Sequence, residues 1–234
     1  MAVPTKGNVT NAKVNMSGSS KTISGHNQVS GDDRLLIVLL TSTDQRNHTS
    51  LTYGGQALTR YTHVRRDNLS SRMSFWYLTD PPTGANNTVV GFSGGMYNPI
   101  SISIRSFKDC GGVGEKVAIN GNSARTSSPK TTSITVEEDS LIVITTCANV
   151  PMNSTSGQQI PTGTNQSFVS HSTTKKIAVG AISSNAGHSA GAVSCRAVAS
   201  QSGQTITLDL FEIKGLGGGG GGETTDNSDF FIMF

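Results

Sequence analysis

Short β-type runs, each closed by glycine or proline, recur along this chain and constrain its fold more than any other feature. From about Ile23 onward, stretches of β-branched, leucine and aromatic residues alternate with turn-forming residues, a spacing typical of sandwiches and barrels. Nowhere does an apolar stripe with the period of a helix extend beyond about two turns. The sequence therefore predicts an all-β, antiparallel fold of about ten strands.

Two apolar runs stand out from the alternating pattern. Leu35–Leu40 and Leu141–Ile144 are unbroken and rich in branched residues, which predicts central strands covered on both faces. In Ile100–Ile104 isoleucine alternates with serine, which predicts that the isoleucines point inward and the serines outward. Phe107 is out of phase with these isoleucines, and a β-bulge near Arg105–Ser106 would account for the change.

Composition divides the chain into four segments. Residues 1–20 are polar and rich in Gly, Ser and Asn, which predicts a flexible N-terminal arm. Residues 21–214 carry the strand pattern and predict one β-sandwich domain, since all-β folds of such length are common as single domains. Residues 215–229 hold a glycine run and an acidic, polar stretch, which predict a mobile Gly-rich tether. Residues 230–234 are wholly apolar.

The charge of the chain excludes some classes of partner. The formal net charge is only +3, and charged residues make up 14% of the chain. No basic run interleaved with aromatic residues is present, so we expect no nucleic-acid partner. The longest apolar run is too short to cross a bilayer, so we expect no membrane partner. The first residues lack the apolar segment of a secretory signal, which favours a protein made in a cytoplasm and not exported.

Motifs that carry chemistry are weak in this sequence. Gly91–Gly95 matches the G-x-S-x-G pattern of serine hydrolases, but Asn98-Pro99 shortly afterwards is a poor start for the required helix, so we expect a glycine-rich β-turn. Asp32-Asp33 lacks the alternating acidic ligands of a calcium loop. No metal-ligand spacing links the five histidines, which are His26, His48, His63, His171 and His188. We expect no enzyme activity, no metal and no cofactor.

The three cysteines are an odd number and lack metal-ligand spacing. Cys147 and Cys195 lie in strand-like runs, and we expect both to be small core residues. Cys110 lies in the turn-like sequence Asp-Cys-Gly-Gly, so we expect it to be the exposed thiol. It is therefore the candidate for an intermolecular disulfide.

Aromatic residues offer one candidate ligand site. Trp76 and Tyr77, with Tyr53 and Tyr61, are candidates for the stacking platform of a carbohydrate-binding site. Neighbouring residues of a strand point to opposite faces, so Trp76 and Tyr77 should face different layers. Packing of these rings in the core is the alternative, and it is the one that we favour.

A group of motifs connects the chain with a known family. Thr52–Thr59 (TYGGQALT) is followed by Phe75–Leu78, by Pro81–Gly84 and by Val89–Gly94. This order resembles a jelly-roll-like β-sandwich family found in tailed-phage virion proteins and in bacterial surface or secreted proteins. The final strand pattern, Thr205–Lys214, is also similar, so the resemblance covers residues from about 20 to 214. It implies a jelly-roll-like antiparallel sandwich in which the motif residues make turns and core, not catalysis.

The apolar segment after the glycine run consists of Phe230, Phe231, Ile232, Met233 and Phe234. Five consecutive large apolar side chains would not stay exposed in a soluble protein. Burying each of them stabilises a complex by roughly 1.5–3 kcal/mol. We expect this segment to dock on a neighbouring subunit or partner, with strand addition as one mode. The alternative is that it folds back onto its own sandwich.

Together with the resemblance, these features predict a non-enzymatic structural protein of a bacteriophage virion. The foremost expectation is a capsid decoration (cement) or other particle-surface protein that docks its neighbours through its termini. Its expected partners are other virion proteins, of capsid or tail, and copies of itself in a homo-oligomer. The first alternative is a carbohydrate- or receptor-binding module of a tail fibre or spike, with a host-surface glycan as ligand. The second is a subunit of a bacterial surface filament or adhesin.

Overall fold

The protein is all-β. The computed structural model describes residues 2–42, 46–66, 71–96, 100–119, 130–148, 152–157, 168–170, 176–178, 181–182, 187–199 and 206–217. Within these residues the regular structure consists of antiparallel strands, without a helix. The all-β, antiparallel prediction is therefore confirmed, but eighteen described strands replace the ten expected. Polar and glycine-rich strands, whose sequences look like loops, account for the difference.

The first half of the chain forms a complete sandwich. Its strands are β1 (Thr5–Val14), β2 (Gly18–Gln28), β3 (Leu35–Ser42), β4 (His48–Tyr53), β5 (Gln56–Ala57), β6 (Thr59–Arg66), β7 (Ser71–Thr79), β8 (Gly84–Met96) and β9 (Ile100–Lys108). One sheet has the order β1-β9-β3-β7-β6 and the facing sheet the order β2-β8-β4-β5. The strands β1–β4 and β7–β9 alternate between the two sheets, which is the jelly-roll arrangement expected from the resemblance.

The second half forms another sandwich with the same order. Its strands are β10 (Cys110–Ile119), β11 (Lys130–Val136), β12 (Leu141–Ala148), β13 (Met152–Gly157), β14 (Phe168–Ser170), β15 (Lys176–Ala178), β16 (Ala181–Ile182), β17 (Gly191–Ala199) and β18 (Ile206–Gly215). The order β10-β18-β12-β16 corresponds to β1-β9-β3-β7, and β11-β17-β13 corresponds to β2-β8-β4. The small sheet β14-β15 stands apart from this correspondence. Residues 21–214 are thus not one sandwich but the larger part of two.

The two halves are an internal structural repeat, and the sequence carries its trace. The central strands begin at Leu35 and Leu141, and the last strands of each half begin at Ile100 and Ile206. The members of each pair are separated by the same number of residues. Asp33 and Asp139, two residues before the central strands, share this separation and both adopt a positive φ, 46° and 61°. Matching strand order, register and backbone conformation therefore identify equivalent positions in the halves.

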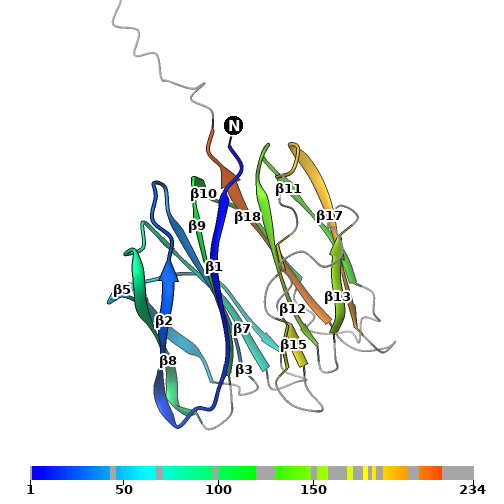
Figure 1. Cartoon of the computed structure of the whole chain (residues 1–234). Coiled ribbons are helices and arrows are strands. Elements are labelled where there is room, and N and C mark those ends of the chain that lie inside the picture. Colours follow the sequence, from blue (N-terminus) through cyan, green and yellow to red (C-terminus); the bar gives the residue numbers. More distant parts are fainter. Residues whose placement is uncertain are drawn as a thin grey trace, which may run out of the picture.

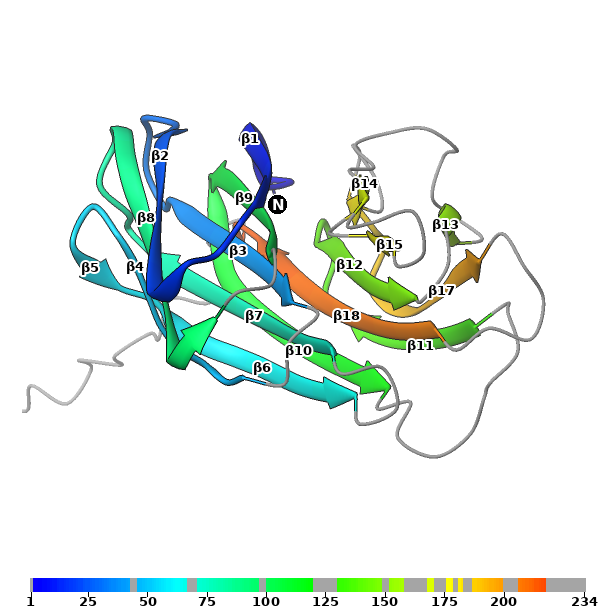
Figure 2. The ribbon, with the colours of Figure 1, turned by 90° about the horizontal axis from the view of Figure 1, so that it is seen from below.

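Four sheets are stacked side by side, as Figures 1 and 2 show. The outer sheet β2-β8-β4-β5 packs on the inner sheet β1-β9-β3-β7-β6 through a core that includes Leu36, Val38, Trp76 and Ile102. The second inner sheet, β10-β18-β12-β16, covers the other face of the first. The outer sheet β11-β17-β13 packs in turn against β18. The two sandwiches are therefore joined by a shared core between their inner sheets, with the members Leu35, Ile37, Leu39, Met73, Phe75, Phe107, Cys110, Leu141, Val143, Phe211 and Ile213.

The unbroken apolar runs are the central strands of the inner sheets, as predicted. All eight residues of β3 are buried, and so are residues Leu141–Ile144 of β12. Successive side chains of β3 enter the core of the first sandwich and the shared core in turn. Apolar residues on both faces suit a strand between two other layers, because neither of its faces meets water.

Strand β9 corrects two expectations. Ser101 and Ser103 are buried and do not point outward, because the second sandwich covers that face of the sheet. Phe107 lies on the serine face and belongs to the shared core, so its change of phase reflects a second core. Strand β9 pairs with β3 without a register shift, and the irregularity is in β1, between Lys6 and Val9.

The expected N-terminal arm is also wrong. Residues 5–14 form strand β1, which pairs with β9 along the edge of an inner sheet. Its side chains are half-buried or exposed. The backbone hydrogen bonds to β9, and not the burial of side chains, therefore hold this edge strand in place. The first residues of the chain are thus an integral part of the first sandwich.

A matched pair of valines tests this layered core. Val38 is fully buried in β3, whereas Val9 in β1 is 44% exposed. We expect Val38→Ala to lower the free energy of unfolding by roughly 1.5–3 kcal/mol, through lost burial and a cavity. Val9→Ala should change it by less than about 0.5 kcal/mol. Urea unfolding of both variants measures the difference, and equal losses would contradict the burial of Val38 in the core of the first sandwich.

Candidate functional site

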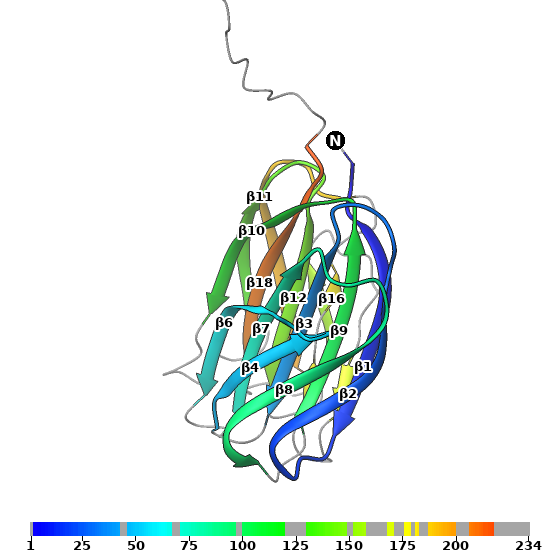
Figure 3. The same cartoon turned by 90° about the vertical axis from the view of Figure 1, so that its left-hand side faces the viewer.

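The two ends of the described chain meet at one end of the stack, which we call the pole. The amide N of Ala2 donates to the carbonyl O of Leu216 at 3.1 Å, and the amide N of Leu216 donates back to Ala2 at 3.0 Å. Figure 3 shows the start of the chain and the end of β18 next to each other. Gly215 and Leu216, expected in the tether, are therefore paired at the pole. Residues 218–229 and the segment Phe230–Phe234 lie outside the described residues.

A buried carboxylate locks the strands beneath the pole. Glu212 in β18 is 2% exposed and accepts three hydrogen bonds. Its Oε2 accepts from the amide N of Glu115 at 2.9 Å. Its Oε1 accepts from the amide N of Glu137 and from Ser140 Oγ, both at 2.7 Å. A methyl group added at Gly114 would lie 1.9 Å from Oε2, so only glycine fits there. Glu212 therefore holds β10, the end of β11 and β18 together.

Beside Glu212 lies a pocket of about 410 Å³. Lys214 forms an ion pair with Glu137 at its rim, and the hydrogen bond to Glu137 raises the pKa of Lys214. The remaining walls come from the first half of β10 and from the end of β11. The amide groups of Glu115 and Glu137, which line this pocket, already donate hydrogen bonds to the carboxylate of Glu212.

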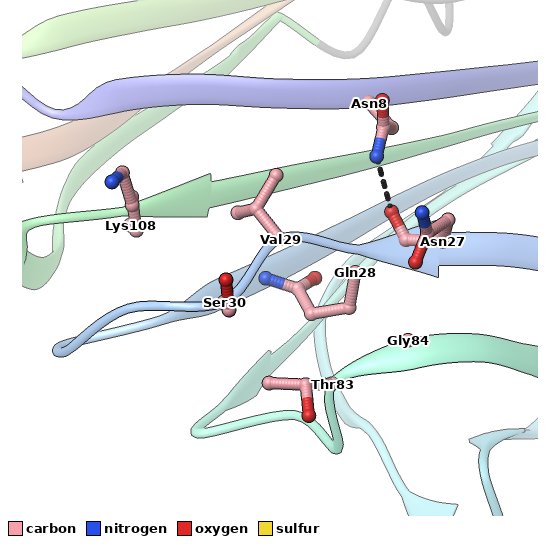
Figure 4. A pocket seen from close by; sticks show the side chains of 8 residues that line it. All are labelled: Asn8, Asn27, Gln28, Val29, Ser30, Thr83, Gly84 and Lys108. Carbon is pink, nitrogen blue, oxygen red and sulfur yellow. Dashed lines mark hydrogen bonds between the residues drawn. The ribbon is translucent and has the colours of Figure 1, made fainter.

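The first sandwich has a larger pocket, of about 540 Å³. Figure 4 shows the residues that line it, which are Asn8, Asn27, Gln28, Val29, Ser30, Thr83, Gly84 and Lys108. Gln28 is 2% exposed, and its Nε2 donates to the carbonyl O of Phe107 at 3.2 Å. Its Oε1 has no hydrogen-bond partner. Asn8 Nδ2 donates to the carbonyl O of Asn27 at 2.8 Å and fixes one wall.

A buried histidine lies in the core next to this pocket. His26 in β2 is fully buried, and its Nδ1 is hydrogen-bonded to Thr10 Oγ1 at 2.9 Å. The Tyr53 hydroxyl donates to the carbonyl O of His26 at 2.9 Å, and the two rings meet edge to face. Burial disfavours the charged imidazolium and lowers the pKa of His26 to about 4.

A second buried histidine joins two serines. His48 Nε2 is 3.0 Å from Ser42 Oγ, and its Nδ1 is 2.6 Å from Ser74 Oγ. Trp76 Nε1 donates to Ser74 Oγ at 2.8 Å. A serine with an adjacent histidine is also the pattern of an activated nucleophile. Here all four side chains are buried in the core of the first sandwich, so the arrangement satisfies polar groups without offering a substrate access.

The predicted stacking residues lie in the two cores. Trp76 is 4% exposed, packs in the core of the first sandwich and has the Arg60 guanidinium over its ring. Tyr77 is half-buried against the shared core and meets the Tyr61 ring edge to face. They point to different layers, as their alternation predicts. Trp76 has no open ring face, so the alternative of core packing describes it correctly.

The expected exposure of Cys110 is wrong. Cys110 is 6% exposed and belongs to the shared core, because Asp109 adopts a positive φ and turns the chain inward. Burial raises the pKa of its thiol to about 12, with the Asp109 and Asp33 carboxylates adding to the effect. A buried thiol of this kind is a poor candidate for an intermolecular disulfide. Cys195 is buried as predicted, and the side chain of Cys147 lies outside the described part.

The other sequence motifs do not form a site in the described part of the chain. Ser93 of the G-x-S-x-G pattern is exposed on strand β8, not in a turn, and its Oγ accepts from the amide N of Asn47 at 2.9 Å. The carbonyl groups of Asp32 and Asp33 accept hydrogen bonds from Asp109 and Cys110. In the described part of the chain, no group of three or more His, Cys, Asp or Glu residues is arranged to hold a metal ion. The described residues also include no helix suited to crossing a membrane.

Sequence reasoning missed both Gln28 and Glu212. Glu212 interrupts the apolar pattern of the last strand between Phe211 and Ile213, which was the available signal. Gln28 has no comparable signal, because a polar residue at a strand end is ordinary. No family model, curated protein or solved structure matches this chain.

The Glu212 lock yields a stability prediction with a matched control. We expect Glu212→Ala to lower the free energy of unfolding by roughly 3 kcal/mol, because three donors lose a charged acceptor in a buried place. Glu137→Ala removes an exposed carboxylate whose ion pair is worth at most about 1 kcal/mol. Urea unfolding compares the two variants. A similar loss in both would contradict the role assigned to Glu212.

His26 gives a prediction about pH. Its pKa is about 4 in the fold and near the ordinary value of 6.5 in the unfolded chain. As the pH falls from 6.5 to 4, the unfolded chain binds a proton that the folded chain does not, so the free energy of unfolding decreases.

We expect His26→Phe to lose less stability than the wild type between about pH 7.5 and about pH 4.5. The pKa of His188 is also lowered by burial, so the variant should retain part of the dependence. Urea midpoints at both pH values measure the effect, and an unchanged difference between them would refute the assignment to His26.

Proposed function

We propose that this chain is a non-enzymatic structural protein of a bacteriophage particle, of the capsid-decoration or other particle-surface type. The observation that carries the proposal is the pole. The chain leaves the second sandwich at Leu216, which is hydrogen-bonded to Ala2, and the sequence continues with a glycine run and the apolar segment Phe230–Phe234. A rigid body that presents an apolar segment on a glycine-rich tether is suited to gripping a neighbour.

The described surface supports this division of roles. Among the described residues, the large hydrophobic side chains that are exposed are Val9 and Val89, at 44% and 36%. Stable protein interfaces contain a buried apolar centre, which two separate valines do not supply. An apolar contact with a neighbour must therefore come mainly from elsewhere in the chain. Phe230–Phe234 is the densest apolar segment outside the described residues.

Distance and energy are sufficient for such docking. The residues from Gly217 to Asp229 reach about 40 Å when extended, so a site on an adjacent subunit is within range. Burial of the five apolar side chains contributes roughly 1.5–3 kcal/mol each, against the cost of ordering the segment. An extended apolar segment can bind by adding a strand to an exposed sheet edge. Each of the five described sheets ends in two edge strands, where such a segment could pair.

The resemblance of Thr52–Thr59 and its following motifs to phage virion proteins supports the particle as the setting. Jelly-roll sandwiches also occur in viral capsid proteins. This is an analogy of fold, which by itself does not determine function. The proposal commits to copies of this chain as the first neighbour of the apolar segment, because a homo-oligomer is the simplest assembly that a particle-surface subunit can form.

Self-association of the purified full chain tests the proposal. We expect the full chain to form oligomers at micromolar concentration and a deletion of residues 223–234 to be monomeric, as measured by sedimentation velocity. Replacing Phe230–Phe234 by five serines should have the effect of the deletion, because the apolar side chains supply the binding energy. Replacing Thr224–Ser228 by five alanines is the matched control and should leave the oligomer intact. A full chain that stays monomeric, or a deletion that still assembles, would overturn the proposal.

A further inference from the structure

The two pockets occupy equivalent places in the two halves. Each lies between the first strand, the end of the second strand and the end of the last strand of its half. Lys108 at the end of β9 and Lys214 near the end of β18 line the respective pockets and share the separation of the repeat. The second pocket therefore serves as a comparison for the first, because its buried polar group, Glu212, is hydrogen-bonded to other groups of the protein.

A bulge in the first strand of each half confirms the correspondence. The register shifts between Lys6 and Val9 in β1 and between Val113 and Lys116 in β10. A glycine follows the first residue of each shift. A methyl group added at Gly7 would lie 2.5 Å from Ser106 Oγ, and one added at Gly114 would lie 1.9 Å from Glu212 Oε2. Ser106 therefore stands where Glu212 stands in the second half, and the carboxylate lock is absent there.

The residue at the end of the second strand also differs between the two pockets. Gln28 pairs with Gly84, the first residue of β8, and Val136 pairs with Gly191, the first residue of β17. Gln28 thus occupies the position of Val136, and both side chains are buried, at 2% and 4% exposure. Unlike valine, the glutamine buries an amide oxygen without a partner. A buried oxygen without a hydrogen-bond partner destabilises the folded state, and the valine of the second half shows that the fold does not need it.

The chemistry of the pocket indicates what completes it. Gln28 Oε1 accepts a hydrogen bond and needs a donor. Ser30 and Thr83 add hydroxyl groups, and Lys108 adds a cation, while the lining includes no carboxylate and no aromatic ring. A hydroxyl-rich ligand both donates to Gln28 and accepts from Lys108. The volume of about 540 Å³ lies within the range usual for small-molecule sites.

We propose that the pocket between β1, β2 and β9 binds a saccharide, with one sugar hydroxyl donating to Gln28 Oε1 and another accepting from Lys108 Nζ. The site is distinct from the candidate aromatic platform at Trp76, which the fold buries. Recognition here depends on hydrogen bonds and not on stacking. The inference is independent of the apolar segment Phe230–Phe234, so a monomeric protein that binds sugar would separate the two proposals.

A titration of the full chain by two-dimensional ¹H–¹⁵N NMR tests the site. The probes are glucose, galactose, N-acetylglucosamine and N-acetylneuraminic acid, each at concentrations up to tens of millimolar. At least one probe should give saturable shifts at the side-chain amides of Gln28, Asn27 and Asn8. Gln28→Val, which installs the residue of the equivalent position, should weaken the binding roughly tenfold or more.

Two further variants test the site independently of Gln28→Val. Thr83 is exposed at the rim, so Thr83→Ala should fold normally and weaken binding even if Gln28→Val does not fold. Thr135→Ala in the second pocket is the matched control and should leave the titration unchanged. Acetate tests whether Lys108 merely attracts any anion. The proposal would be overturned by the absence of saturable shifts with all four sugars, by equal shifts with acetate, or by unchanged binding in both Gln28→Val and Thr83→Ala.

Discussion

The shared core between the two inner sheets is the constraint on which the rest of the structure depends. It joins residues of both halves, from Leu35 and Phe75 in the first to Leu141 and Phe211 in the second. Because this core covers the second face of each inner sheet, the central strands β3 and β12 carry apolar runs whose side chains are buried on both faces. The same cover buries polar groups that would otherwise meet water. Arg105 is 1% exposed, burial lowers the pKa of its guanidinium to about 10, and its Nε donates to Ser103 Oγ. The halves are therefore parts of one body.

The internal repeat shows how equivalent positions of one fold diverge. In the second half Glu212 ties three strands and an apolar Val136 closes the wall. In the first half Ser106 is too short for this lock, and Gln28 replaces the valine. Both halves keep a pocket at this place, but in the second half its buried carboxylate is hydrogen-bonded within the protein, whereas in the first half the oxygen of Gln28 is not. Each half thus serves as a reference for the other, which gives the pocket a meaning that its residues alone would not have.

Much of the local structure was predictable from particular residues. Gly54-Gly55 makes the turn between β4 and β5 with a positive φ at both glycines, and the prolines that begin at Pro81 follow the end of β7. The alternation in β7 assigned Trp76 and Tyr77 to opposite faces correctly. The errors have a common origin. Ser101, Ser103 and Cys110 were expected at the surface because they are polar or lie near a turn, and the packing of the two sandwiches on each other buries all three.

The sequence by itself determined the strand class, the two buried central strands and the faces of the alternating strands, because a period of two is a property of one strand and its own side chains. Only the tertiary structure decided what covers each face, since this depends on which sheet packs there. It also decided that two sandwiches share a core, that Ala2 meets Leu216, and that Gln28 is buried with an unsatisfied oxygen. These contacts join residues far apart in the chain, and no local pattern specifies them.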